Sequence, residues 1–348
     1  MNILFRYGEF HNQTVAFPAR STSFMYPNLF SASLVDGFSE GLNKTFNIMC
    51  HHMRFRFTEV ETVMPDDTFY FTILRNPTSH MESTFSYYKG ATPFRQFKTL
   101  EQFLSNASAY YDRNMRSGFY AKNFMTFDLG FENNGRDTTK NLQIRLRVIE
   151  EIFDLVLITE YFDESLILLK EALCWSFDDV LSIPLNSRSN STKKDLSLEI
   201  QKKIQTWNNL DWPIYSYFNN SFWKRVEKFG WERMKREVNT LLLKRAEVTE
   251  KCLQGEVDPQ KLKDKSLMPY QSGSARILGY NLKPDLPAEY KLLCQRLVTP
   301  ELQYSALLHH MQKSSQAGTD ITEPPKNLTK PPIKPAKPPA RLKRAKKH

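Results

Sequence analysis

Residues 68–88, TFYFTILRNPTSHMESTFSYY, constrain the fold of this chain more than any other stretch. The apolar, β-rich run at 68–74 predicts a strand that is buried on both faces of a parallel sheet. Asn76 and Pro77 end this pattern, and proline suits the first position of the helix that we expect at 77–88. The stretch therefore predicts a strand, a tight turn and a helix, which is the repeating unit of an open α/β sheet.

Arg75 stands where the predicted strand gives way to the helix. Free backbone N–H groups and the helix dipole favour an anion at such a helix start, and a guanidinium adds a planar fork of donors. We interpret the turn as a phosphate site. The alternative is that Arg75 only forms an ion pair at the surface.

Other segments extend the same pattern. We expect further strands at 46–50 and 153–160. Helices are expected at 1–7, 77–88, 100–111, 138–151, 163–174, 195–209, 221–250 and 286–313, with a loop at 258–283. Asn2 is a possible cap of the first helix. Strands that alternate with helices predict a parallel sheet covered by helices.

His51 and His52 follow the predicted strand at 46–50. A lone histidine is more often structural than catalytic. A histidine at the exit of a buried strand, just before a candidate phosphate site, is nevertheless a reasonable candidate for a general base.

The net charge of +10 is concentrated in a tail. Nine Lys and Arg residues and no acidic residue follow Pro324, so the body of the chain has almost no net charge and is not expected to recruit nucleic acid. We expect residues 317–348, rich in Pro and Lys, to be disordered. A solvated tail is the simpler interpretation, and contact with anionic lipid or proteoglycan is the other.

The four cysteines show no close C-x-x-C spacing, so we expect no metal site, and the sequence leaves their pairing open. Six N-glycosylation sequons weakly favour a secretory lumen; they are Asn12, Asn43, Asn106, Asn190, Asn219 and Asn327. No stretch approaches the ~20 apolar residues that span a bilayer, and the start of the chain shows no signal-peptide pattern.

Several motifs resemble those of known sulfotransferases. R-N-P with a serine eight residues after the arginine resembles the 3′-phosphate motif of enzymes that use 3′-phosphoadenosine 5′-phosphosulfate. NIMCHHMRF, FTILRNP, ESTFSYY, FDLGFEN, LITEYFDESLILLKEALCW and ILGYNLK together resemble the galactose 3-O-sulfotransferase family, which includes the galactosylceramide sulfotransferases. The resemblance runs in order from the first residues to about Gln316, so we expect a sulfotransferase domain at 1–316.

The resemblance implies a P-loop-like α/β sulfotransferase fold in the Golgi lumen, anchored to the membrane by an N-terminal helix. It implies sulfate transfer from that donor to O3 of a terminal β-galactose on a glycolipid or glycan. His52 would be the base that takes the hydroxyl proton, and Arg75 and Ser83 would hold the 3′-phosphate of the donor. His51, Arg54 and Tyr87 would be neighbours without an assigned role.

The sequence departs from the family pattern at its start. From the resemblance we expect that this chain lacks the membrane anchor, the first strand and the Lys-Thr loop that binds the 5′-phosphosulfate. We therefore expect little or no turnover from it as it stands. Three hypotheses follow. They are an N-terminally truncated galactose 3-O-sulfotransferase, which we favour; a non-catalytic protein that binds the donor or a glycan; and another phosphoryl-type enzyme, for which no nucleotide loop is seen.

Overall fold

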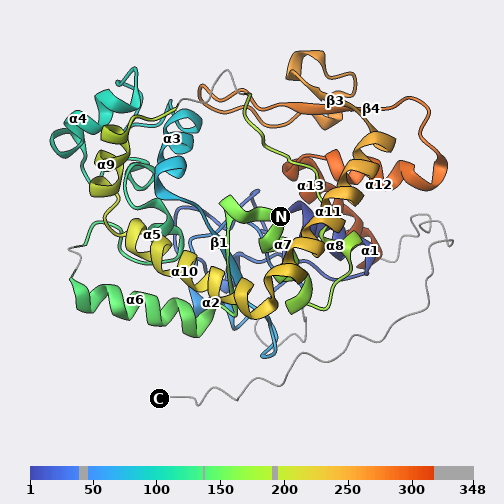
Figure 1. Cartoon of the computed structure of the whole chain (residues 1–348), viewed down its shortest axis with the longest axis horizontal. Coiled ribbons are helices and arrows are strands. Elements are labelled where there is room, and N and C mark those ends of the chain that lie inside the picture. The colour runs from blue at the N-terminus through green and yellow to red at the C-terminus, as the bar shows by residue number, and fades with distance from the viewer. Residues whose placement is uncertain (39–45, 136–137, 190–194, 317–348) are drawn as a thin grey trace.

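A two-stranded parallel sheet lies at the centre of the molecule (Figure 1). The computed structural model describes residues 1–38, 46–135, 138–189 and 195–316. Within them, β1 (Phe71–Leu74) pairs in parallel with β2 (Leu155–Ile158). The strands predicted at 68–74 and 153–160 are therefore confirmed, with shorter bounds.

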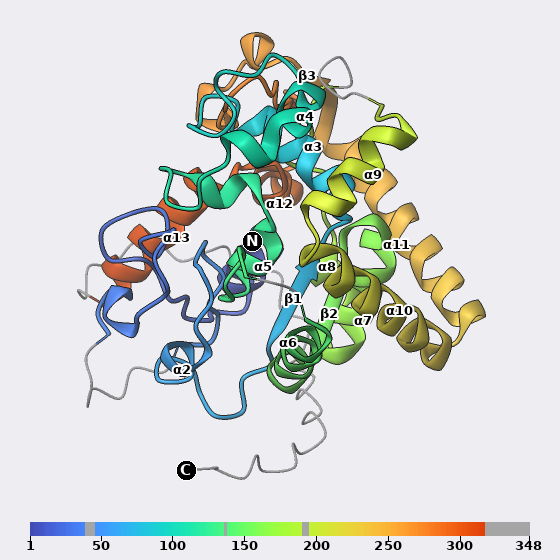
Figure 2. The same ribbon diagram turned by 90° about the vertical axis from the view of Figure 1, so that its left-hand side faces the viewer.

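Helices cover the sheet unevenly. All four residues of β2 are buried, and both α7 and α10 contact this strand. In β1 the side chain of Ile73 is 44% exposed. Figure 2 shows α7, α10 and α11 on one side of β1 and the N-terminal segments with α2 on the other. An unbroken apolar run such as Leu-Val-Leu-Ile is stable only when both of its faces are covered.

The helices of the described residues differ widely in length. Their bounds are α1 Asn2–Phe10, α2 Phe57–Val60, α3 Pro77–Tyr87, α4 Leu100–Tyr110, α5 Phe124–Asp128, α6 Thr139–Ile152, α7 Phe162–Ala172, α8 Phe177–Val180, α9 Leu198–Trp207, α10 Asp211–Phe229, α11 Trp231–Cys252, α12 Ala288–Val298 and α13 Glu301–Gln316. The helices predicted at 77–88, 100–111, 138–151, 163–174 and 195–209 are confirmed with small shifts. Four of these begin at a polar cap whose side chain accepts a backbone N–H bond; the caps are Asn76, Thr99, Thr138 and Ser197.

Two long predicted helices were wrong in their extent. The helix predicted at 221–250 is two helices, α10 and α11, because Gly230 adopts a φ of 97° that ends the first and redirects the chain. The helix predicted at 286–313 is likewise divided at Pro300 into α12 and α13. Proline lacks the N–H that would continue the ladder of hydrogen bonds.

The strand predicted at 46–50 was wrong. These residues form only one isolated parallel bridge, between Ile48 and Val15. The side chains of Phe46 and Ile48 instead enter two separate clusters beside the sheet. The apolar run is short, so packing of its side chains decides its conformation.

A second sheet, antiparallel, lies where mostly loop was expected. β3 (Leu253–Val257) pairs with β4 (Gly279–Leu282), inside or beside the loop predicted at 258–283. A disulfide joins Cys252 to Cys294 and so links the end of α11 to α12, whereas Cys50 and Cys174 are free thiols. The sequence left this pairing open, and the fold decides it.

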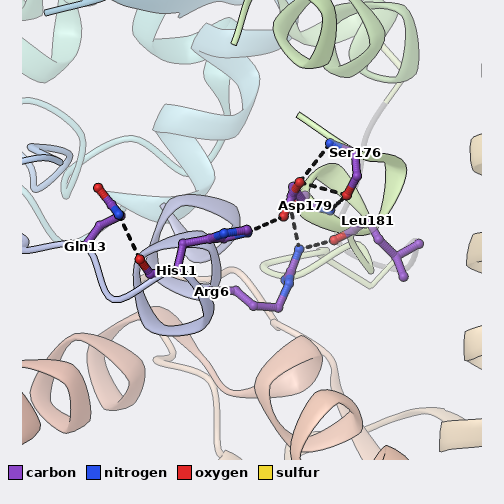
Figure 3. Close-up of polar contacts among 6 residues, drawn as sticks. All are labelled: Arg6, His11, Gln13, Ser176, Asp179 and Leu181. Atoms are coloured by element: carbon purple, nitrogen blue, oxygen red, sulfur yellow. Dashed lines mark hydrogen bonds and ion pairs between the residues drawn. The ribbon is translucent and has the colours of Figure 1, made fainter. Parts of the chain in front are cut away.

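The helix predicted at 1–7 is confirmed as α1, but Asn2 is not its cap. Asn2 lies inside the helix, and its Nδ2 donates to the carbonyl of Thr299 at 2.6 Å. Figure 3 shows how α1 is held against α8: buried Arg6 donates to the carbonyl of Leu181, and His11 Nε2 lies 2.8 Å from Asp179 Oδ1. These contacts fix α1 beside the segments that follow β2.

Two expectations from the sequence concern membranes and the tail. No helix in the part of the chain that the structure describes has the length and apolar character needed to cross a bilayer. The tail at 317–348 lies outside the described residues.

Candidate functional site

The C-terminal ends of β1 and β2 bring Arg75 and Glu160 to the start of α3. The Asn76 side chain caps this helix by accepting the Thr78 N–H at 2.9 Å. Glu160 Oε1 accepts the Asn76 N–H at 3.0 Å and also contacts Ser79 Oγ at 3.3 Å. An anion therefore does sit at this helix start, as the sequence suggested, but it is a carboxylate of the protein.

Arg75 lies along the side of α3. Its Nε donates to Ser79 Oγ at 3.2 Å, and its guanidinium is half-buried. Ser83 follows Ser79 by four residues, so the two hydroxyls lie on one face of the helix, one turn apart. The Arg75 guanidinium therefore contacts Ser79, which was not singled out from the sequence, on the helix face that also carries Ser83.

A second guanidinium lies near this face. Arg188 forms a bidentate ion pair with Glu82 of α3, with one contact at 3.2 Å. Burial lowers the pKa of Arg75, the carboxylate of Glu160 opposes this shift, and the positive charge of Arg188 adds to it. Two guanidiniums that repel each other beside serine hydroxyls form a donor set that suits a phosphate.

His52 lies at the other part of the candidate site. Its Nε2 is 3.1 Å from Oε1 of Glu301, the first residue of α13. The histidine side chain is 64% exposed and that of Glu301 is 22% exposed. The hydrogen bond to Glu301 raises the pKa of His52 above its ordinary value, against the opposing effect of burial. An exposed imidazole oriented by a carboxylate is the usual arrangement of a general base.

His51 faces the opposite way and is buried. Its Nε2 is 2.7 Å from Ser305 Oγ, and its ring packs among the rings of Phe5, Phe17 and Phe24. Burial lowers the pKa of His51 to about 4. This histidine is a neutral part of the core at ordinary pH.

Asp128 is an acidic neighbour of His52 that sequence reasoning missed. Its Oδ1 accepts the hydroxyl of Tyr26 at 2.7 Å. Burial raises the pKa of Asp128 to about 7, although both the Tyr26 bond and the nearby His52 act to lower it. Asp128 therefore titrates near neutrality beside the candidate base, which is common at functional sites.

Helix α5 connects the two parts of the site. At its start, the sulfur of Met125 accepts the N–H of Arg75 at 3.4 Å. At its end, the carbonyl of Asp128 accepts the N–H of Phe55, three residues after His52, at 2.9 Å. No direct contact joins His52 to Arg75 or Ser83 within the described residues, so a ligand that reached both parts would have to extend over α5.

Arg54 is held by the same region. It donates to the carbonyls of Phe127 and Phe131, at 3.3 and 3.2 Å, and its guanidinium lies 4.0 Å from the centre of the Phe127 ring. Through these contacts Arg54 stabilises the end of α5 and the loop that follows it.

The comparisons with known proteins agree on one family. A model of the family described as galactose-3-O-sulfotransferase matches residues 1–312. The chain belongs to the galactose-3-O-sulfotransferase family. Its members are enzymes that sulfate galactose. The resemblance inferred from the sequence motifs is therefore confirmed.

Relatives in this family match most of the chain. Galactose-3-O-sulfotransferase 2 of Sus scrofa is 46% identical over 94% of this chain and 82% of its own length. Human galactosylceramide sulfotransferase is 40% identical over 87% of this chain and 73% of its own length. Galactose-3-O-sulfotransferase 4 of Bos taurus is 34% identical over 90% of this chain and 80% of its own length. No solved structure matches the chain.

A shallow hollow lies away from the residues that the family resemblance singles out. Its volume is about 330 Å³, and it lies at the N-terminal ends of β1 and β2, lined in part by Phe69, Asp154 and Arg225. Ligands of open α/β sheets bind at the opposite, C-terminal ends of the strands. We therefore do not assign this hollow to the galactose-3-O-sulfotransferase reaction.

The predicted sequons fall in different surroundings. Asn12 and Asn106 are exposed, whereas Asn219 is half-buried within α10, with its Oδ1 enclosed. Asn43, Asn190 and Asn327 lie outside the described residues. In the part of the chain that the structure describes, no group of three or more His, Cys, Asp or Glu side chains is arranged to hold a metal ion.

Proposed function

We propose that this protein transfers sulfate from 3′-phosphoadenosine 5′-phosphosulfate to the 3-hydroxyl of a terminal β-galactose on galactosylceramide or on glycoprotein glycans. The observation that supports it best is the exposed His52, held by Glu301 beside Asp128, in a chain of this family. The choice of donor and acceptor extends what the names of the relatives say of those proteins.

His52 would act as the general base. When its Nε2–H donates to Glu301, the lone pair on Nδ1 is left free to accept the proton of the galactose 3-hydroxyl. Glu301 would then stabilise the imidazolium that forms and keep the ring oriented. The proton passes from O3 to Nδ1 as O3 bonds to sulfur, and it leaves His52 to solvent after the products depart.

Arg75 and Ser83 would hold the 3′-phosphate of the donor, with Ser79 and Arg188 as additional donors on the same face. When bound, the donor supplies an activated sulfuryl group, whose sulfur–oxygen bond to the 5′-phosphate breaks during transfer. The protein groups bind and orient this molecule, and such placement accounts for much of the rate enhancement in reactions of this kind.

Transfer of labelled sulfate from the donor to galactosylceramide and to a β-galactoside tests the proposal. Wherever the wild-type protein transfers sulfate, His52→Ala should lower kcat by about 10²- to 10⁴-fold. His310→Ala, at an exposed histidine on α13, is the matched control and should keep normal activity. Near-normal turnover by His52→Ala would exclude His52 as the base.

The same assay separates the proposal from its alternative. A wild-type chain that binds the donor or a galactoside but transfers no sulfate would be a non-catalytic binding protein.

We also propose that the protein works on the lumenal side of the Golgi membrane, attached to it through an N-terminal anchor as family resemblance implies. The disulfide between Cys252 and Cys294 supports an oxidising compartment. Exposed sequons at Asn12 and Asn106 support the same location. Mass spectrometry of protein expressed in the secretory pathway should find an N-glycan at Asn12, at Asn106 or at both. Unmodified asparagines at these positions, together with reduced Cys252 and Cys294, would argue against the lumen.

A further inference from the structure

A short segment links the two helices that border the candidate site. We call residues 268–274 the strap. At one end, Gln303 Nε2 of α13 donates to the carbonyl of Met268 at 2.7 Å. At the other end, Ser272 Oγ donates to the carbonyl of Tyr87, the last residue of α3, at 2.8 Å. In Figure 1 the chain around the strap runs along the top of the view towards α3. Tyr270 lies midway between these attachments.

The attachment to α3 is specific. The backbone N–H and the hydroxyl of Ser274 both donate to the carbonyl of Ser86, at 3.0 and 3.1 Å. Gly273 adopts a φ of 58°, and a Cβ on it would lie 2.4 Å from the carbonyl oxygen of Tyr87. Only glycine permits this close approach. The strap is therefore held to the end of α3 at a defined distance.

The strap carries an exposed aromatic ring, Tyr270, between its attachment to α3 and its attachment to α13, the helix that begins at Glu301. Glu301, which orients His52, is two residues from the Gln303 that holds the strap. The side chain of Tyr270 is 60% exposed, so its ring is accessible to a ligand. Burial, the phenol of Tyr270 and the carboxylate of Glu301 all raise the pKa of Tyr87, so the three side chains share one region.

The chemistry of galactose matches this arrangement. Because O4 of galactose is axial, the C–H groups at C3, C4 and C5 form an apolar patch on one face of the sugar. Such a patch packs well against aromatic rings, and a tyrosine hydroxyl can bond to sugar hydroxyls at the edge. Sites for small ligands commonly combine aromatic walls with a few placed polar groups.

We propose that Tyr270 and Tyr87 form the platform on which the terminal galactose of the acceptor packs, with O3 directed towards His52. The platform rests on the proposed function and names the subsite that recognises the sugar. The adenine of the donor also has a flat face, so the test must separate acceptor binding from donor binding.

Steady-state kinetics of Tyr270→Ala are the first test. The KM for the galactoside should rise about tenfold while the KM for the donor stays within about twofold. Tyr270→Phe and Tyr270→Trp should restore most of the affinity because they keep the ring. Tyr110→Ala, at a tyrosine of α4 that is 52% exposed, is the matched control. An unchanged acceptor KM, or a change confined to the donor KM, would overturn the platform.

A binding measurement keeps the platform separate from catalysis. Saturation-transfer NMR should detect methyl β-galactopyranoside on the wild-type chain, a much weaker signal on Tyr270→Ala, and a weaker signal for methyl β-glucopyranoside. If this pattern is found without sulfate transfer, the platform stands and the proposed function fails. Equal signals from wild type and Tyr270→Ala, or no signal from wild type, would overturn the platform.

Discussion

His51 and His52 are adjacent in the sequence, but their rings meet different partners. His51 enters the core, where it is only 4% exposed, while His52 reaches solvent beside Glu301. The different surroundings of the two rings decide between a structural and a catalytic role, because both residues have the same intrinsic chemistry.

Glu301→Gln tests the pairing at the level of single residues. The carboxylate raises the pKa of His52, and catalysis needs the neutral imidazole, so the rate should rise as pH rises through that pKa. Removal of the negative charge should lower the pKa of His52 and shift the acidic limb of the kcat/KM profile to lower pH. The plateau rate should fall about tenfold because the base is weaker.

The control for this experiment is Glu289→Gln, at an exposed residue of α12. Its pH profile should match that of the wild type. If Glu301→Gln leaves the acidic limb in place, then Glu301 does not set the protonation of His52. Its role would be limited to orienting the imidazole ring.

At the scale of elements, the site depends on how helices begin and end. Pro300 stops α12, so that α13 starts at Glu301 and presents this carboxylate to His52. The strap then joins α13 to the end of α3. A helix that ran unbroken through 286–313, as the sequence suggested, would place Glu301 in mid-helix.

Gly273→Ala tests the strap. The left-handed conformation costs an ordinary residue roughly 1–2 kcal/mol, and the added Cβ would meet the carbonyls of Tyr87 and Ser86. We expect the strap to detach locally, with faster hydrogen exchange at the Ser274 amide and a higher KM for the galactoside.

Gly90→Ala is the matched control, because a Cβ at Gly90 meets no atom within 4 Å. It should leave both exchange and kinetics unchanged. Slow exchange at the Ser274 amide in Gly273→Ala would mean that the strap tolerates a side chain at this position and does not depend on glycine.

At the scale of the whole molecule, a disulfide connects the end of α11 to α12. Cys252 and Cys294 are fully buried and 42 residues apart in the sequence. Closing a loop of this length reduces the freedom of the unfolded chain. The bond therefore stabilises the part of the fold from which α13 and the strap extend.

Replacing both cysteines with serine should lower the free energy of unfolding by roughly 2–4 kcal/mol, measured by denaturant titration. Cys174→Ser, at an exposed free thiol, should have little effect. Equal stability of the double variant and the wild type under oxidising conditions would show that the bond does not constrain the unfolded chain.

The amino-acid sequence was sufficient to predict the elements whose signals are local. The apolar runs at 68–74 and 153–160 became β1 and β2, and polar caps fixed the starts of several helices. Family resemblance supplied His52, Arg75 and Ser83 as candidates, because short motifs survive in order along the chain. These signals depend on neighbours within a few positions.

Contacts between residues that are far apart in the sequence became visible only in the folded chain. Glu301 lies 249 positions from His52, and Ser272 lies 185 from Tyr87. Nothing in local periodicity links such pairs, since their contact follows from the packing of whole helices and from the breaks at Gly230 and Pro300. The same packing buried His51 and left His52 exposed, and so it separated a core residue from a candidate base.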